Sequence, residues 1–390
     1  MPERLKNLKI YIKGDPALAG IGLLLVLISF AVVFSTSSNL VNIYQTHSHW
    51  FYLLKHTILI ATAIFLFIVS MHLPVEYLRK SIPVLMILTV LLLVYTLFFG
   101  ISANGDTARR WIKIPFATIQ PSFIAMYVLM IFTADFLDKI KNKKTTLLED
   151  FKTYWAWVFL SIGLIMPANN STAALILGMI FIILFVGGYS FGKLTVILLT
   201  GIALIGIYYG LAKAFPRYIP NRFETAESRI KEFLGIGDDE KKAKKVFELD
   251  QPTRAKMAIA SGGLIRWAPG KSVQKNMLSQ SSSDFVYAVI IEEYGVLLGG
   301  IGILFLYLFL FVRIWIIAYN LKSYFKKILV LALGLPIIIQ ALINMSVATG
   351  LIPVTGQPLP LISMGGTSIM MTGLILGIIV KISEDIYEDE

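Results

Sequence analysis

The sequence predicts an all-α polytopic membrane protein with ten transmembrane helices. Hydrophobic residues make up 56% of its 390 residues and charged residues only 15%, whereas a soluble domain carries roughly 25% charge. The mean hydropathy is +0.74. The charged residues gather in short blocks between long apolar runs, so most of the chain is suited to lipid and not to water.

Ten apolar runs are candidate membrane spans, because a helix needs about 20 residues to cross a bilayer. They lie near residues 17–37, 51–73, 81–100, 120–138, 154–167, 171–188, 193–213, 284–318, 327–350 and 365–383. The fifth run is short and ends at Pro167, which favours a tilted or partly inserted helix. We expect one membrane domain that covers residues 1–390.

Lysine and arginine in the short loops predict the orientation, because cytoplasmic loops carry an excess of these residues. On the side with few cations, the short loops contain only Arg109, Arg110 and Lys113. Both termini, 1–16 and 384–390, are therefore expected to be cytoplasmic. The polar segment 215–283 then forms a large extracytoplasmic loop between spans 7 and 8. Within it, residues 251–263 have the pattern of an amphipathic helix.

The composition argues against several classes of protein. The net charge is +11, but the cations are dispersed between apolar runs, so no nucleic-acid partner is indicated and contacts with membrane lipids are expected. The absence of cysteine excludes disulfides, thiol catalysis and thiolate metal sites. No Walker loop, H-E-x-x-H or G-x-S-x-G pattern occurs, so ATP hydrolysis, zinc proteolysis and serine hydrolysis have no support, and no metal site is predicted.

The most distinctive stretch is GLIPVTGQPLPLISMGGTS at 350–368, which is uncharged and rich in glycine and proline. Irregular backbone of this kind is not tolerated against lipid, because its N–H and C=O groups would stay unpaired. It must lie against protein or line a cavity at the membrane surface. A tightly packed external loop without function is the alternative interpretation.

Asp284 begins the eighth apolar run. An aspartate at the mouth of an apolar helix is costly unless it is paired, so it is a candidate functional residue. The alternative is that Asp284 is the N-cap of this helix, and the two roles are compatible. Glu292 and Glu293 lie two turns further along, broadly on the same face. Glu293 either orients a cation or a neighbouring helix, or makes a purely structural hydrogen bond.

Several segments resemble the SEDS (shape, elongation, division and sporulation) family of FtsW, RodA and SpoVE proteins. They are P-V-T-G-Q-P-L-P-L-I-S-M-G-G-T-S at 353–368, S-V-Q-K at 272–275, D-F-V-Y-A-V-I-I-E-E-Y-G at 284–295, R-R-W-I-K-I-P at 109–115 and I-Q-P-S at 119–122. The resemblance covers nearly the whole chain and its ten-span layout. The S-V-Q-K and I-E-E-Y-G patterns look more like the division branch than the elongation branch.

This resemblance implies a peptidoglycan glycosyltransferase of the bacterial cytoplasmic (inner) membrane, with its active site on the extracytoplasmic face. Such a protein polymerises lipid II into glycan strands during cell division or elongation. Asp284 falls at the position of the family's catalytic carboxylate and would act as a general base. A class B penicillin-binding protein, which is a transpeptidase, is the expected partner, together with other division or elongation proteins. No cofactor is firmly implied, and it stays open whether Mg²⁺ or Mn²⁺ assists the departure of pyrophosphate.

Substrate-binding candidates follow from the same segments and from the charge of the leaving group. A departing pyrophosphate needs compensating positive charge, which arginine supplies in bidentate fashion. The candidates are Arg109, Arg110, Lys113, Lys271, Gln274, Lys275, Glu293, Ser363, Gly365 and Gly366. For the arginines, anchoring to lipid headgroups is the alternative.

The chain departs from the family pattern in its fourth span. Where the family commonly has a glutamate and a lysine one turn apart, this sequence has Phe123 and Met126. Two other functions therefore stay open, a flippase or transporter of a lipid-linked substrate and a catalytically inactive scaffold. The absence of an internal pseudo-symmetry argues against a transporter. Replacement of Asp284 separates the three, because only the polymerase must lose synthesis.

Overall fold

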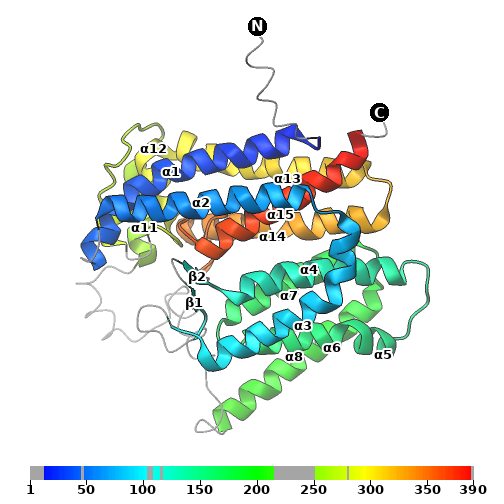
Figure 1. Cartoon of the computed structure of the whole chain (residues 1–390). Coiled ribbons are helices and arrows are strands. Elements are labelled where there is room, and N and C mark those ends of the chain that lie inside the picture. The colour runs from blue at the N-terminus through cyan, green and yellow to red at the C-terminus, as the bar shows by residue number, and fades with distance from the viewer. Residues whose placement is uncertain are drawn as a thin grey trace.

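The protein is a helical bundle with two halves, shown in Figure 1. The computed structural model describes residues 13–44, 48–102, 109–114, 117–214, 251–278 and 281–387. One half contains α1 (Pro16–Tyr44), α2 (His49–Met71), α13 (Ile303–Asn320), α14 (Tyr324–Thr349) and α15 (Gly366–Tyr387). The other contains α3 (Val75–Phe99), α4 (Pro121–Ile140), α6 (Ala156–Ile165), α7 (Asn170–Val186) and α8 (Phe191–Ala214). Contacts of α14 with α4 and α7 join the halves.

Each predicted apolar run corresponds to helical structure, which confirms a multi-span membrane protein. Within the described ranges, six helical segments are long and apolar enough to cross a bilayer: Pro16–Asn39, His49–Met71, Val75–Phe99, Val286–Asn320, Tyr324–Thr349 and Gly366–Tyr387. The helices Asn170–Val186 and Phe191–Ala203 are apolar but shorter.

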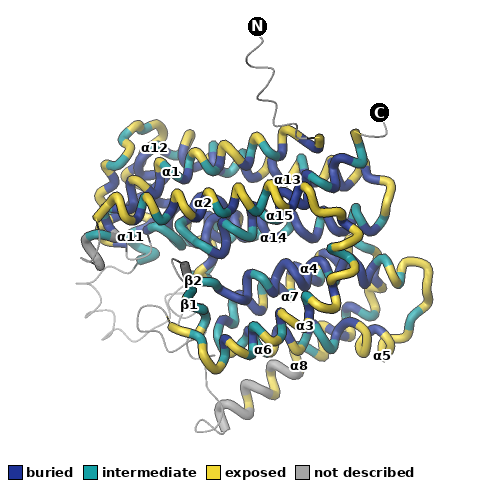
Figure 2. Tube along the Cα trace, in the orientation of Figure 1, coloured by how far each residue is buried: buried dark blue, intermediate teal, exposed yellow. Residues whose placement is uncertain are grey.

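Burial separates a central pair of helices from the peripheral ones (Figure 2). In α14 and α15, 72% of the most apolar window is buried, compared with 28% in α2 and α3. The exposed faces of the peripheral helices carry large apolar side chains such as Phe65, Leu91 and Phe98. These faces are suited to contact with lipid.

The contact between α2 and α15 depends on two glycines, Gly373 and Gly377, spaced four residues apart. A Cβ on Gly373 would lie 2.5 Å from the carbonyl oxygen of Ala63, and one on Gly377 would lie 2.0 Å from Ser70 Oγ. Small residues at this spacing let two membrane helices approach closely. The sequence of α15 therefore determines how near α2 can pack.

The eighth apolar run is helical throughout but is not one regular α-helix. It consists of α12 (Val286–Gly295), the π-helical segment η4 (Val296–Gly302) and α13. Gly295 has a φ of 77°, and a Cβ there would lie 2.7 Å from the backbone nitrogen of Arg266. The N–H of Val296 donates to the carbonyl of Gly263 at 2.9 Å. The break thus accommodates loop backbone that lies against the helix.

Three further local features differ from or refine the expectation. The all-α prediction missed a short antiparallel pair, β1 (Ile112–Ile114) and β2 (Ala117–Ile119), whose strands are too brief to give a sequence pattern.

The fifth span begins earlier than predicted, with α5 (Leu147–Asp150) and the π-helical η2 (Phe151–Trp155) ahead of α6, because Thr146 and Glu149 form a capping box. The predicted amphipathic helix is confirmed as α11 (Gln251–Gly262), whereas residues 215–250 lie outside the described part of the chain.

The two ends of the bundle carry different structures. At one end, which we call the termini end, Asp15 forms an ion pair with Arg313 and accepts a hydrogen bond from Tyr387. Arg79 lies over the ring of Phe325 at the same end, 4.4 Å from its centroid. The opposite end, which we call the loop end, contains the hairpin, α11 and the segment 350–365 (Figure 1).

Candidate functional site

The glycine- and proline-rich stretch 350–368, which we call the signature segment, folds against the turn that carries Asp284. The hydroxyl of Ser363 donates to the carbonyl of Ser283 at 2.8 Å, and the N–H of Met364 donates to the carbonyl of Ser282 at 2.9 Å. Gly356 brings loop backbone next to the carboxylate, because a Cβ there would lie 3.7 Å from Asp284 Oδ2. Segments some 70 residues apart in the chain therefore meet at one place.

The side chain of Asn344 on α14 donates hydrogen bonds to both the Asp284 turn and the signature segment. Its Nδ2 donates to the carbonyls of Asp284 at 3.0 Å, Gln357 at 2.8 Å and Ser283 at 3.3 Å. Asn344 is buried. Sequence analysis did not single it out, although an amide inside an otherwise apolar span is a signal for an interhelical or functional contact.

The end of α14 places the signature segment where Asn344 can reach it. Gly350 has a φ of 74°, its N–H donates to Val347 at 3.1 Å, and the N–H of Leu351 donates to Ser346 at 2.8 Å. This is a Schellman motif, which glycine favours because it adopts the left-handed conformation without penalty. A second tie is made by Gln357, whose side chain donates to Thr172 on α7 at 2.9 Å.

Asp284 is half-buried in the turn before α12. The helix begins at Val286, and its N-cap position is Phe285. The interpretation of Asp284 as the N-cap is therefore wrong by one residue, because the turn 281–285 continues past it. Asp284 is held through its backbone carbonyl by Asn344, which leaves the side chain at the border between the loop and the helix mouth.

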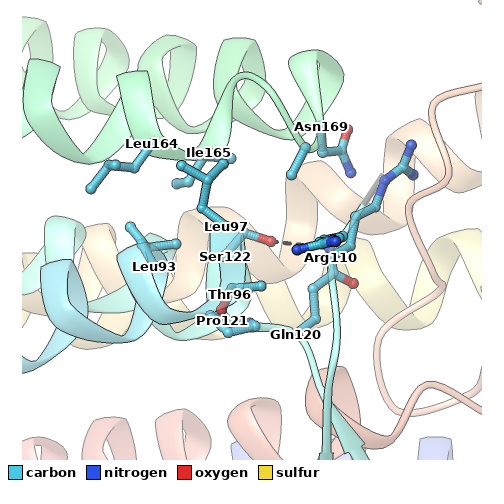
Figure 3. Close-up of a pocket in the computed structure, with 12 residues that line it drawn as sticks. Leu93, Thr96, Leu97, Arg110, Gln120, Pro121, Ser122, Leu164, Ile165 and Asn169 are labelled. Carbon is cyan, nitrogen blue, oxygen red and sulfur yellow. Dashed lines mark hydrogen bonds between the residues drawn. The ribbon is translucent and has the colours of Figure 1, made fainter. Parts of the chain in front are cut away.

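Arg109 and Arg110 lie at the loop end beside a small cavity (Figure 3). This cavity, of about 20 Å³, is lined by Arg109, Arg110, Gln120 and Asn169 among others. Its size is that of one water molecule, not of a sugar. Arg110 is half-buried, whereas Arg109 is exposed and donates to the carbonyl of Phe98.

Lys113 is exposed on β1, opposite Thr118 of β2. The hairpin is fixed to the start of α15, because Thr367 Oγ1 accepts from the N–H of Gln120 at 2.9 Å and donates to the carbonyl of Thr118 at 3.2 Å. Gly365 and Gly366 precede this contact. A Cβ added to Gly366 would lie 3.4 Å from the side chain of Leu59, so the backbone of Gly366 packs against α2.

Glu292 holds the segment that contains S-V-Q-K. Its carboxylate accepts from the hydroxyl of Ser272, from the N–H of Val273 at 2.9 Å and from the N–H of Gln274 at 3.3 Å. Glu292 is buried, so these donors compensate for the loss of water around its charge. Gln274 is thereby positioned through its backbone.

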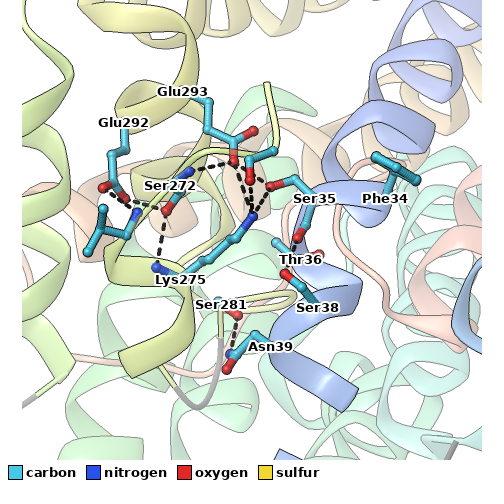
Figure 4. Close-up of polar contacts among 12 residues, drawn as sticks. Phe34, Ser35, Thr36, Ser38, Asn39, Ser272, Lys275, Ser281, Glu292 and Glu293 are labelled. Carbon is cyan, nitrogen blue, oxygen red and sulfur yellow. Dashed lines mark hydrogen bonds and ion pairs between the residues drawn. The ribbon is translucent and has the colours of Figure 1, made fainter. Parts of the chain in front are cut away.

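Glu293 forms a buried cluster with Lys275 and α1 (Figure 4). Its Oε1 accepts from the hydroxyl of Ser35 and from the N–H of Ser272 at 3.2 Å, and it lies 3.8 Å from Lys275 Nζ. Lys275 also donates to the carbonyl of Gly270 at 2.6 Å and to Ser35 at 3.2 Å. Burial lowers the pKa of Lys275, and the neighbouring carboxylates offset part of that effect. Glu293 thus contacts both a cation and a neighbouring helix.

A further contact from α1 reaches the segment just before Asp284. Asn39 Nδ2 donates to the carbonyl of Leu278 and to Ser281 Oγ, each at 2.7 Å (Figure 4). Lys271, by contrast, is exposed. Of the predicted cations near Asp284, Lys275 is committed to the buried cluster and Lys271 faces outward.

The two departures from the family pattern lie in the protein interior. Phe123 and Met126 are buried on α4. Met126 Sδ accepts a hydrogen bond from Gln340 Nε2 of α14 at 3.2 Å. Met126 thus links α4 to α14, and neither position carries a charge.

The described side chains do not favour a protein-held metal ion. Among them, no group of three His, Asp or Glu side chains is close enough to hold one. We therefore derive no step through Mg²⁺ or Mn²⁺.

Comparisons with known proteins agree with the architecture. The FtsW/RodA/SpoVE family model, described as "Cell cycle protein", matches residues 17–388. The chain is 28% identical over 344 residues to the probable peptidoglycan glycosyltransferase FtsW of Wigglesworthia glossinidia brevipalpis, covering 86% of this chain and 85% of that protein. It is 30% identical over 325 residues to the protein of the same name from Trichlorobacter lovleyi, covering 81% and 79%.

Two solved structures have a similar fold. A chain from a structure described as "Structural coordination of polymerization and crosslinking by a peptidoglycan synthase complex" has a TM-score of 0.71 at 22% identity, covering 96% of this chain and 99% of that chain. The rod shape determining protein RodA of Thermus thermophilus has a TM-score of 0.66 at 22% identity, covering 97% and 98%. At this level of identity the likeness shows the fold.

Proposed function

The chain belongs to the FtsW/RodA/SpoVE family of cell cycle proteins, and on that premise we propose that it is a peptidoglycan glycosyltransferase that polymerises lipid II. The relatives named above carry the description of probable peptidoglycan glycosyltransferase. The observation that carries the proposal is the half-buried Asp284, held beside the signature segment by Asn344 and Ser363.

Glycosyl transfer to a sugar hydroxyl requires a general base, and we assign this role to Asp284. A sugar hydroxyl of one lipid-linked substrate attacks the anomeric carbon of another, forming the glycosidic C–O bond. The bond from that carbon to the pyrophosphate oxygen breaks, and the lipid pyrophosphate leaves with the electron pair. Asp284 accepts the proton of the attacking hydroxyl, a role that typically contributes about 10²–10⁴ in rate.

The remaining predicted residues divide into two roles. Arg109, Arg110 and Lys113 offer positive charge at the loop end for the pyrophosphate, and Lys271 is an exposed cation on the segment before Asp284. The rest hold the site in shape: Gln274, Lys275, Glu293, Ser363, Gly365 and Gly366. We assign these residues to positioning of the loops around Asp284.

The topology that fits this function has ten spans with both termini in the cytoplasm. The loop end then faces outward from the bacterial cytoplasmic membrane, where lipid II is polymerised. The partner is a transpeptidase, a class B penicillin-binding protein, as the similarity to a chain of a peptidoglycan synthase complex suggests.

A catalytically inactive scaffold is the second candidate. It is favoured by the apolar packing of Phe123 and Met126, where the family commonly has charged residues.

The test is reconstitution of the full chain with its transpeptidase in proteoliposomes that contain lipid II. Formation of glycan strands supports the polymerase. Movement of lipid II between leaflets without polymer would indicate a transporter, and neither activity, at full partner binding, would indicate a scaffold.

A further inference from the structure

A second cavity lies at the termini end, away from the site described above. It has a volume of about 500 Å³ and lies between the first turns of α3 and the ends of α4, η2 and α6. Its polar wall contains the cations Arg79, Lys80 and Lys139, together with Asp135. Cavities of this size are typical of small-ligand sites.

Apart from Thr153 on η2, the rest of the cavity wall is apolar. It includes Ile82, Met86 and Ile87 on α3, Phe132 on α4 and Trp157 on α6. Along α3 the two cations come first and the apolar residues follow over the next two turns, which corresponds to about 12 Å along the helix axis. The cavity is thus charged at the membrane edge and apolar toward the membrane interior, which is the profile of a lipid.

The charge in this region favours an anion. Arg79 pairs with Asp135 at 2.9 Å and with Asp138 at 2.6 Å, and Lys139 pairs with Asp135 at 2.6 Å. Lys80 has no ion-pair partner within the described ranges. Among the residues that line the cavity, three are cations and one, Asp135, is a carboxylate, so the lining carries net positive charge.

The cations that are paired still present donors to the cavity. The side chain of Arg79 is 37% exposed and that of Lys139 is 64% exposed.

We propose that this cavity binds one anionic glycerophospholipid from the leaflet at the termini end. Its phosphate contacts Lys80 and the exposed donors of Arg79 and Lys139, and one acyl chain lies along the apolar wall. A zwitterionic lipid would bring a cationic group against three cations. This cavity lies at the termini end, whereas Asp284 lies at the loop end beside the signature segment.

The test measures lipid binding to the purified full-length protein by native mass spectrometry, with phosphatidylglycerol and phosphatidylcholine as probes. Wild type is expected to bind phosphatidylglycerol at least fivefold more tightly. Lys80→Gln should weaken binding about fivefold, as expected for loss of one lysine at an anionic surface. Ile87→Trp should weaken it similarly by filling the apolar wall. Lys143→Gln, which removes an exposed cation that does not line the cavity, should leave binding unchanged.

The outcomes against the proposal are equally specific. Equal binding of the two phospholipids would overturn the proposed site. An equal loss of phosphatidylglycerol binding in Lys80→Gln and Lys143→Gln would also overturn it. Tighter binding of a polyprenyl phosphate than of phosphatidylglycerol would overturn the assignment to a phospholipid. Lys80 and Ile87 are both exposed, and thermal unfolding without added lipid checks that the variants are folded.

Discussion

Replacement of Asn344 by leucine should damage the site without removing any group that reacts. The side chain of Asn344 on α14 donates to both the Asp284 turn and the signature segment. Leucine has a similar volume and no donor, so the three carbonyls lose this partner while the helix is kept. We expect both lower stability and slower polymerisation.

The expected loss of stability follows from the number of hydrogen bonds that the Asn344 amide can donate. An amide nitrogen has two hydrogens, so the three contacts of Asn344, at 2.8, 3.0 and 3.3 Å, amount to about two full hydrogen bonds. Each is worth about 1 kcal/mol net, and a buried carbonyl left unpaired costs about 1–3 kcal/mol. Asn344 Oδ1 has no hydrogen-bond partner among the described residues, so its removal offsets part of the loss. The expected destabilisation is about 2–4 kcal/mol.

The assay combines thermal unfolding with glycan polymerisation from lipid II. A displacement of the Asp284 turn by about 1 Å is enough to lower the rate about 100-fold. Gln340→Leu is the matched control, because Gln340 lies one turn earlier on α14 and its amide donates only to the weak acceptor Met126 Sδ. If Asn344→Leu behaved like Gln340→Leu in both measurements, the hydrogen bonds of Asn344 would have no role in positioning Asp284.

Three further changes test the supports of the site and the bundle by thermal unfolding. Lys275→Met should lower the free energy of unfolding by about 3–5 kcal/mol, because it leaves the buried carboxylate of Glu293 without its cation. The double variant with Glu293→Gln should regain much of that stability, and simple addition of the two single effects would contradict the pairing. Gly295→Ala should lower the free energy of unfolding by more than the roughly 1–3 kcal/mol expected from its positive φ alone, because its Cβ would also lie 2.7 Å from the backbone nitrogen of Arg266. Gly302→Ala, with its nearest neighbour at 3.6 Å, should be nearly neutral. Gly377→Val should separate α2 from α15 and prevent stable folding; a variant as stable as Gly302→Ala would refute the close contact.

Hydropathy was sufficient to locate the helices, because every long apolar run has to satisfy its backbone within the membrane. It was not sufficient to place the break at Gly295. That break depends on the backbone of residues 263–268, which lies against the helix although it is distant in the chain. The hairpin of β1 and β2 was missed for a similar reason, since it is fixed by Thr367 from the far end of the sequence.

The site was predictable in its parts but not in its connections. The resemblance selected Asp284 and the signature segment, and the structure brings these two together. Asn344 escaped notice because an amide in an apolar run has no motif of its own. The burial of Lys275 could not be inferred from S-V-Q-K, because it requires the loop to fold back onto Glu292 and Glu293.

The most direct measurement of the central claim is polymerisation of lipid II by Asp284→Asn beside wild type, with the partner transpeptidase present. Asparagine keeps the shape of the side chain and cannot accept the proton. Asp385→Asn, which removes a carboxylate at the termini end, serves as the control. We expect polymer from wild type and from the control, and a loss of about 100-fold or more with Asp284→Asn. Polymer at the wild-type rate from a folded Asp284→Asn protein would contradict the assignment of Asp284 as the base.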